Sequence, residues 1–213
     1  NITQKMMPPV DKADSADYTI DEILHPTGWT LLNFIMDSRT GLGRFHNFRI
    51  SNYQLMMNLI DFCRSHDPAE VLEMPDVKER VDLYFAHQEK FVEQLKRQTT
   101  IYKNLAYIDM LNEDIIYAGN RFMIYALYPD VNVSMHAMWR INGQRIVYAV
   151  GKSILNRSNI INIGELLLQY GGGGHANVGT CQIDLDQAAA VKDELIAILT
   201  DPLYTEVPDK TAE

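Results

Sequence analysis

The sequence predicts an α/β protein with a mainly helical first part, a connecting helix and a smaller domain built on a mixed sheet. Two observations carry the prediction. Up to about residue 100 the apolar residues recur at helical spacing, whereas beyond it short apolar, β-prone runs are separated by polar breaks. The chain has 213 residues, 46% of them hydrophobic, which is enough for a substantial core. We therefore expect one large or two small domains.

The helices of the first part are predicted from their start signals. Ser51 can cap a helix that carries apolar residues from Leu55 to Cys63. The run Asp67-Pro68-Ala69-Glu70 combines a cap, a proline at the first helical position and an acid at the third. A long amphipathic helix follows, with apolar positions from residue 77 to residue 95, and we predict that it connects two domains.

The second part alternates strands and helices. Asn142-Gly143 is a strong hairpin turn between the third and fourth predicted strands. We predict strands at residues 105–110, 122–128, 133–139, 146–153 and 178–183, and helices at residues 162–170 and 185–199. This order of elements indicates a mixed sheet with helices packed on it.

The charge balance limits the classes of partner. A net charge of −9 argues against tight, sequence-independent binding to long nucleic acid, because that affinity comes from Lys and Arg that neutralise phosphates. Arginines cluster in residues 38–60 and 131–175, which could face a small anionic ligand or lie on a solvated surface. No run approaches the ~20 apolar residues of a membrane span, so no membrane partner is expected. Cys63 and Cys181 form no disulfide framework, which predicts a reducing cytoplasm.

The most informative segment is Tyr170-Gly171-Gly172-Gly173-Gly174-His175, between a predicted helix and a strand. Consecutive glycines allow positive φ, which we expect at Gly173, and let backbone amides approach an oxyanion that the histidine can also contact. The glycines close a helix rather than open one, and no Lys-Ser/Thr pair follows, so this is neither a P-loop nor a dinucleotide fingerprint. The simpler interpretation is a helix stop, which needs only one glycine.

A second polar segment, Ser153-Ile154-Leu155-Asn156-Arg157-Ser158, leaves a predicted strand and enters a loop. Arg157 offers a planar fork of donors that matches phosphate, and the two serines offer hydroxyls. Taken alone, an exposed arginine is more often part of a weak surface ion pair. The functional interpretation depends on its pairing with the glycine-histidine segment.

Together these segments resemble a known family. The order Ser153, Arg157-Ser158, a short helix, Gly171 to His175 and then Gly179 resembles the DHHA1 domain of DHH-family phosphoesterases, over roughly residues 102–199. That family includes nano-RNases, cyclic-dinucleotide phosphodiesterases and exopolyphosphatase-related proteins. The resemblance implies that the substrate-binding positions here are Ser153, Arg157, Ser158, Gly171, Gly172, Gly173, Gly174 and His175.

The N-terminal part extends the resemblance. Asp14-Ser15-Ala16-Asp17-Tyr18 is similar to the last motif of the family's catalytic domain, which implies that Asp14 binds a divalent metal, Mn²⁺ or alternatively Mg²⁺. Without the resemblance, a solvated turn or helix cap would be the better interpretation of this segment. Residues 36–45 and 48–52 are similar to a stretch typical of the exopolyphosphatase-related branch, and Arg39 and Arg44 in it are candidate phosphate contacts.

The sequence also departs from the family pattern. The Asp-x-Asp and Asp-His-His motifs of the catalytic domain have no counterpart in the sequence, so the metal site is incomplete and we expect the chain alone to be inactive. The resemblance then divides the chain into the C-terminal part of a doubly wound DHH domain (residues 1–75), a connecting helix (76–100), a DHHA1 substrate-binding domain (101–205) and a tail (206–213).

The expected function is that of the substrate-binding portion of a manganese-dependent phosphohydrolase, of phosphodiesterase or exopolyphosphatase type. Its partner would be a small phosphate-bearing substrate, such as a short single-stranded oligonucleotide, a cyclic dinucleotide or polyphosphate, and a homodimer is a candidate assembly. Two alternatives remain open. One is a non-catalytic nucleic-acid-binding DHHA1 module, which the acidic charge balance disfavours. The other is an interaction domain that has lost activity.

Overall fold

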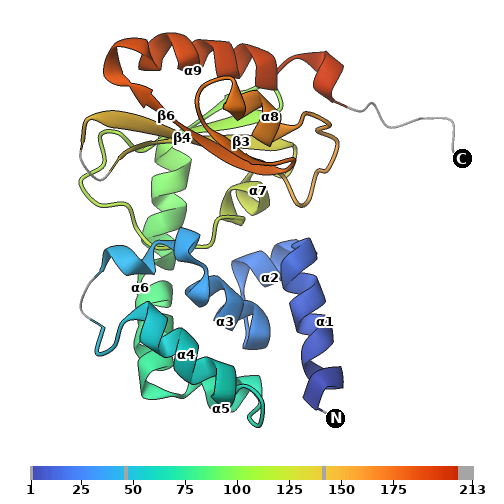
Figure 1. Cartoon of the computed structure of the whole chain (residues 1–213), viewed down its shortest axis with the longest axis vertical. Helices are drawn as coiled ribbons and strands as arrows, with labels where there is room; N and C mark the ends of the chain where they lie inside the picture. Colours follow the sequence, from blue (N-terminus) through green and yellow to red (C-terminus); the bar gives the residue numbers. More distant parts are fainter. Residues whose placement is uncertain (1, 46–47, 141–142, 206–213) are drawn as a thin grey trace, which may run out of the picture. The chain divides into compact units, whose positions relative to one another are not determined.

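The computed structural model describes residues 2–45, 48–140 and 143–205, which form two compact units (Figure 1). The first unit contains the residues up to Gln94 together with Ile115–Met123, and the second contains Leu95–Asp114 together with the residues from Ile124 on. These two units are defined by contacts alone, and the predicted limits of the family domains stay a prediction. None of the helices within the described ranges is long and apolar enough to cross a membrane.

The first unit is helical, as the sequence predicts. Its helices are α1 (Ile2–Ser15), α2 (Ile20–Leu24), α3 (Gly28–Met36), α4 (Asn52–Phe62), α5 (Pro68–Leu72) and most of α6 (Pro75–Gln98). Two single 3₁₀ turns, Ser38–Thr40 and Leu42–Arg44, follow α3.

Both predicted helix starts are confirmed. The Ser51 hydroxyl accepts the N–H of Gln54 at 3.1 Å and caps α4. Asp67 and Glu70 form a reciprocal capping box at the start of α5, in which the side chain of each accepts the backbone N–H of the other. The long predicted helix is α6, which is continuous from Pro75 to Gln98.

The segment Ile115–Met123 completes the core of the first unit. Phe122 packs against Tyr18 and Phe34, with ring centroids 5.7 and 6.1 Å away. The buried side chain of Asn120 donates to the carbonyl oxygen of Ile23 at 3.1 Å and to the hydroxyl of Tyr84 at 2.9 Å. This segment is therefore fixed by contacts with residues far away in the sequence.

The second unit is built on a six-stranded sheet with the order β1-β2-β3-β4-β6-β5. The strands are β1 (Thr99–Tyr102), β2 (Leu105–Asp109), β3 (Val133–Trp139), β4 (Arg145–Lys152), β5 (Gly173–His175) and β6 (Val178–Asp184). Strands β2 and β3 pair in parallel and all the other pairs are antiparallel, so the predicted mixed sheet is confirmed.

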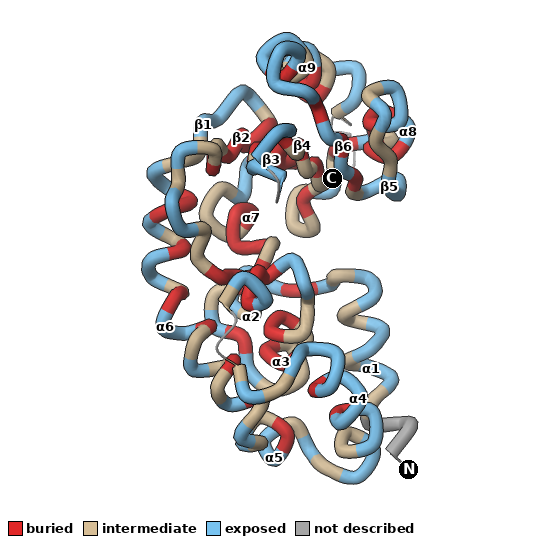
Figure 2. The backbone as a smooth tube through the Cα atoms, turned by 60° about the vertical axis from the view of Figure 1, so that its left-hand side comes forward, coloured by how far each residue is buried: buried red, intermediate tan, exposed pale blue. Residues whose placement is uncertain are grey.

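Helices α8 (Ile163–Leu168) and α9 (Leu185–Leu199) cover one face of this sheet. Alternate residues of β4, namely Ile146, Tyr148 and Val150, point to that face and are buried with Leu167 of α8 and Leu195 of α9. The buried positions, drawn red in Figure 2, follow the central strands and the inner sides of the two helices. Cys181 of β6 lies in this core as a free thiol. Burial raises the pKa of this thiol to about 11.

One predicted strand is wrong. Residues 122–128 contain α7 (Met123–Leu127), because the Asn120 side chain accepts the N–H of Phe122 and starts a helical turn. Tyr125 on α7 then hydrogen-bonds through its hydroxyl to Ser134 and to the carbonyl oxygen of Gly151, both at 2.8 Å. The hydrogen bonds of Tyr125 join residues 9 and 26 positions apart, so an apolar, aromatic run does not reveal them.

The other differences concern short elements. The edge strands β1 and β5 were not predicted, and β5 consists of Gly173, Gly174 and His175. The predicted hairpin between β3 and β4 is confirmed by their antiparallel pairing, with Gly143 at φ +64°, while Asn142 lies outside the described residues. The predicted tail at residues 206–213 also lies outside them.

Candidate phosphate-binding site

The glycine run begins by ending α8. Gly171 has φ +70°, and the N–H of Gly172 donates to the carbonyl oxygen of Leu167 at 2.9 Å, which closes a Schellman motif. A Cβ on Gly172 would lie 2.1 Å from the carbonyl oxygen of Thr180, so only glycine fits there. The helix stop is therefore real, but it accounts for only the first glycines of the run.

The later glycines allow three backbones to pack without side chains between them. A Cβ on Gly174 would lie 2.2 Å from the carbonyl oxygen of Val178 in β6, and a Cβ on Gly164 would lie 2.7 Å from the carbonyl oxygen of Gly174. The backbones of α8, β5 and β6 therefore pack directly against one another. Gly173 is different, because it has no positive φ and a Cβ there would meet nothing within 4 Å. The expected positive φ at Gly173 is wrong.

The serine-arginine loop follows β4 and is held by its own hydrogen bonds. The hydroxyl oxygen of Ser153, which is only 3% exposed, accepts the N–H groups of Leu155 and Asn156 at 3.1 and 3.0 Å. The exposed Arg157 donates from Nε to the carbonyl oxygen of Ile154 at 3.0 Å. Ser153 therefore fixes the turn, and Arg157 lies on its outer side.

Ser158 is held by a buried amide. Its hydroxyl oxygen accepts a hydrogen bond from Nδ2 of Asn132 at 3.0 Å, and the main-chain oxygen of Asn132 accepts the N–H of Ser153 at 2.8 Å. Asn132 is 1% exposed and immediately precedes β3. No local pattern in the sequence predicts this residue as part of the site, because it lies 26 positions before Ser158.

The sheet brings this loop and His175 to the same end of the second unit. Gly151 of β4 pairs with Val178 of β6, and Val178 pairs with His175 of β5, so the three residues form one row across the sheet. The N–H of Lys152 donates to the carbonyl oxygen of Asn177 at 2.9 Å. Burial lowers the pKa of Lys152, and the side chain of His175 is exposed. The loop after β4 and the turn after β5 are therefore neighbours.

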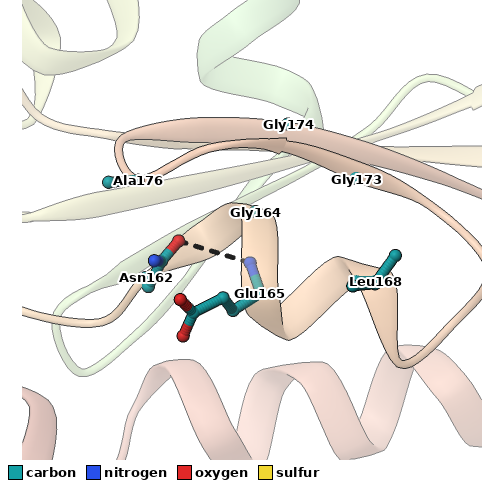
Figure 3. A pocket seen from close by; sticks show the side chains of 7 residues that line it. All are labelled: Asn162, Gly164, Glu165, Leu168, Gly173, Gly174 and Ala176. Carbon is teal, nitrogen blue, oxygen red and sulfur yellow. Dashed lines mark hydrogen bonds between the residues drawn. The ribbon is translucent and has the colours of Figure 1, made fainter.

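An open hollow of about 470 Å³ lies beside this row, between α8 and the glycine strand (Figure 3). Gly173 and Gly174 line it together with Asn162 and Glu165, and the Asn162 side chain accepts the N–H of Glu165 at 3.3 Å. Arg157 and His175 are not among its lining residues. Because the carboxylate of Glu165 would repel an anion, the hollow itself is a poor phosphate site.

The predicted metal ligand Asp14 lies exposed in the last turn of α1. Its neighbour Ser15 donates to the carbonyl oxygen of Asp11 at 2.7 Å. Among the residues that the structure describes, no group of three His, Cys, Asp or Glu side chains could hold a metal ion. These residues do not fit a complete manganese centre, so metal binding by Asp14 stays a prediction.

A second Asp-Ser pair, Asp37-Ser38, was not singled out by the sequence analysis. Asp37 ends α3 and accepts hydrogen bonds from the main chain of Arg39 at 2.9 Å and from its Nε at 2.8 Å. Burial alone would raise the pKa of Asp37, but Arg39 and the nearby Arg121 hold it below its ordinary value. Two arginines therefore hold this carboxylate in place, whereas the carboxylate of Asp14 is exposed. The repeated Asp-Ser pair is the signal that could have identified Asp37.

The two candidate phosphate contacts of the first unit interact locally. Arg39 is the partner of Asp37, while the guanidinium of Arg44 folds over Gly41, where a Cβ would lie 2.0 Å from Nη1. Gly41 has φ +83°, a backbone conformation that favours glycine, whereas the guanidinium is the end of a flexible side chain that could move aside. A role for either arginine toward phosphate stays a prediction.

No family model matches the sequence, and no curated protein matches it. Among solved structures, the chain is similar to the pGpG-specific phosphodiesterase PggH from Vibrio cholerae, with 56% identity, 92% of this chain covered and a TM-score of 0.83. The chain spans 66% of the length of that protein.

Two more distant structures are also similar. An exopolyphosphatase-related protein from Bacteroides fragilis has 16% identity and a TM-score of 0.45, with 76% of this chain and 47% of that one covered. CDC45 from Entamoeba histolytica has 9% identity and a TM-score of 0.51, with 81% and 38% covered, a likeness of fold alone.

Proposed function

The chain belongs to the DHH/DHHA1 phosphoesterase family, and on that basis we propose that it is the substrate-binding portion of a phosphodiesterase that acts on short 5′-phosphorylated oligonucleotides. The observation that supports this most is the 56% identity with a pGpG-specific phosphodiesterase, which makes pGpG the first candidate substrate. The activity is proposed for a whole protein of which this chain spans a part.

The residues proposed to bind the substrate phosphate are Arg157, Ser158 and His175. Arg157 is exposed and can offer two parallel N–H donors to one phosphate, and His175 adds a donor from the end of β5. Strand β5 lies at the edge of the sheet, so part of its backbone is available to an anion. A cluster of donors on an otherwise acidic chain favours a small anionic ligand over a long nucleic acid.

A divalent metal, Mn²⁺ or alternatively Mg²⁺, would neutralise charge on the reacting phosphate in the whole protein. The proposed part of this chain is to bind and orient the substrate. Arg157 and the hydroxyl of Ser158 would hold one phosphate in place, and His175 would hold the same group from its end of the row Gly151–Val178–His175.

The proposal is tested by isothermal titration calorimetry of the 213-residue chain with pGpG, with GMP and with GpG, which lacks the 5′-phosphate. We expect pGpG and GMP to bind and GpG to bind at least about tenfold more weakly, because the charged hydrogen bonds to phosphate are lost. Arg157→Lys should weaken pGpG binding. Arg145→Lys is the matched control, since Arg145 lies at the opposite end of β4 and pairs with Asp184 at 2.6 Å.

Equal affinities for pGpG and GpG would refute the proposed phosphate site. Tight binding to a long single-stranded RNA, with no preference for a 5′-phosphate, would instead favour the alternative of a non-catalytic nucleic-acid-binding module. A strong salt dependence would accompany that second result, because long nucleic acid binds mainly through released counterions.

A further inference from the structure

A network of three asparagine side chains lies beneath the serine-arginine loop. Asn132 is at its centre, with Asn104 and Asn159 on one side of its amide and the hydroxyls of Ser158 and Thr205 on the other. Asn132 and Asn159 are buried, 1% and 4% exposed. An amide has one oxygen that only accepts and one nitrogen that only donates, so the direction of such a network can be deduced from its fixed ends.

Two backbone groups fix that direction. The Asn159 oxygen Oδ1 accepts the N–H of Ile161 at 3.1 Å, so its nitrogen must face Asn132, at 3.2 Å. Asn104 donates from Nδ2 to the carbonyl oxygen of Leu199 at 3.0 Å, so it too presents a donor to Asn132, at 2.7 Å. Both neighbours donate to the same atom of Asn132, which must therefore be Oδ1.

The opposite side of the amide is then a donor. Nδ2 of Asn132 lies 3.0 Å from the hydroxyl oxygen of Ser158 and 3.4 Å from that of Thr205, and both hydroxyls accept from it. The hydroxyl proton of Ser158 must point away from Asn132. Within the described part of the chain, the Ser158 side chain has no other hydrogen-bond partner.

We infer that Asn132 is a positioning residue that presets Ser158 as a hydrogen-bond donor to the substrate phosphate. The inference rests on the proposed function and adds that the Ser158 hydroxyl acts toward the phosphate as a hydrogen-bond donor. A phosphate carries only acceptors, so a hydroxyl that already directs its proton outward loses no orientational freedom on binding. The main-chain oxygen of Asn132 also accepts the N–H of Ser153, so one buried residue contacts both serines of the serine-arginine loop.

Asn132→Asp tests this polarity with almost no change of shape. A carboxylate can still accept from Asn104 and Asn159, and its second oxygen would accept from Ser158 and Thr205, so its buried charge receives up to four donors. The Ser158 proton would then turn inward. We expect GMP affinity to fall at least about tenfold and no less than in Ser158→Ala, because one hydrogen bond to a charged group is lost in each case and Asn132→Asp also adds a negative charge.

A double-mutant cycle separates polarity from charge. The added negative charge would weaken GMP binding whether or not Ser158 is present, whereas the polarity effect needs the hydroxyl. Asn132→Asp should therefore cost less affinity in the Ser158→Ala background than in the wild type. Equal losses in both backgrounds would overturn the inference. Thr205→Val is the matched control and should bind GMP as the wild type does, since Thr205 receives the same amide without flanking Arg157.

A measurement without ligand decides the direction of the network directly. In ¹⁵N-edited NOESY spectra of the wild-type chain, the side-chain amide protons of Asn132 should show cross-peaks to the β protons of Ser158 and the methyl protons of Thr205. Cross-peaks to the side-chain amide protons of Asn104 and Asn159 without these would mean the opposite orientation and would overturn the inference. If the wild-type chain binds neither GMP nor pGpG, the proposed function is refuted, and the ligand role of Ser158 with it.

Discussion

Three adjacent glycines should respond very differently to the same added methyl group. Gly171→Ala places a Cβ in open space but at φ +70°, so it should cost about 1 kcal/mol of backbone strain. Gly172→Ala places a Cβ 2.1 Å from the carbonyl oxygen of Thr180 and 2.7 Å from Cα of Cys181. Because neither atom can move by a rotamer change, we expect a loss of at least about 3 kcal/mol.

Gly173→Ala is the matched control, since its Cβ would meet nothing within 4 Å and its φ is not positive. Its free energy of unfolding should change by less than about 0.5 kcal/mol. Urea unfolding followed by the fluorescence of Trp139 in β3, in a Trp29→Phe background, reports on the second unit. Similar losses for all three variants would refute the close packing of the glycine run against β6.

Three further outcomes follow from the structure. With Mn²⁺, the 213-residue chain should hydrolyse neither bis-p-nitrophenyl phosphate nor short oligonucleotides, because its sequence has no counterpart of the family's Asp-x-Asp and Asp-His-His motifs; metal-stimulated turnover that disappears in Asp14→Ala would contradict this. Arg157→Lys and His175→Ala should each weaken GMP binding by ~1–3 kcal/mol, with a coupling of at least ~0.5 kcal/mol in the double variant, and strict additivity would show that they do not share a phosphate. Burial lowers the pKa of His136 to about 4 from an ordinary 6.5, so the unfolded chain binds more protons between these values and stability should fall as the pH is lowered through this range. The urea midpoint of His136→Gln should vary less with pH than that of the wild type, and parallel curves would count against the shift.

The parts of the fold that were predicted from the sequence depend on local signals. Ser51 and Asp67 cap helices through bonds that span three residues or fewer, so the pattern alone identifies them. Strand β3 was predicted with its observed limits, because its alternation reflects one buried face. Helix α7 was missed although Asn120 accepts an N–H only two residues away, because the packing of Tyr125 depends on partners 9 and 26 residues further along the chain.

Only part of the candidate site could likewise be predicted from the sequence. The resemblance identified Arg157 and the glycine-histidine segment by type and order, while their shared location follows from strand pairing that the sequence does not encode locally. Asn132 carries no local signal, since an isolated asparagine before a strand usually belongs to a turn. Its importance comes from four side-chain neighbours that are between 26 and 73 residues away.

The two-part construction of the first unit has a consequence for its synthesis. A ribosome releases the chain from the N-terminus, so Ile115–Met123 emerges only after β1 and β2, which belong to the other unit. Until then Tyr84 and the carbonyl of Ile23 lack the Asn120 amide that binds them both. The first unit therefore cannot complete its core until Ile115–Met123 has emerged, and its nascent form should remain open to proteases and chaperones for the time needed to translate two strands of its neighbour.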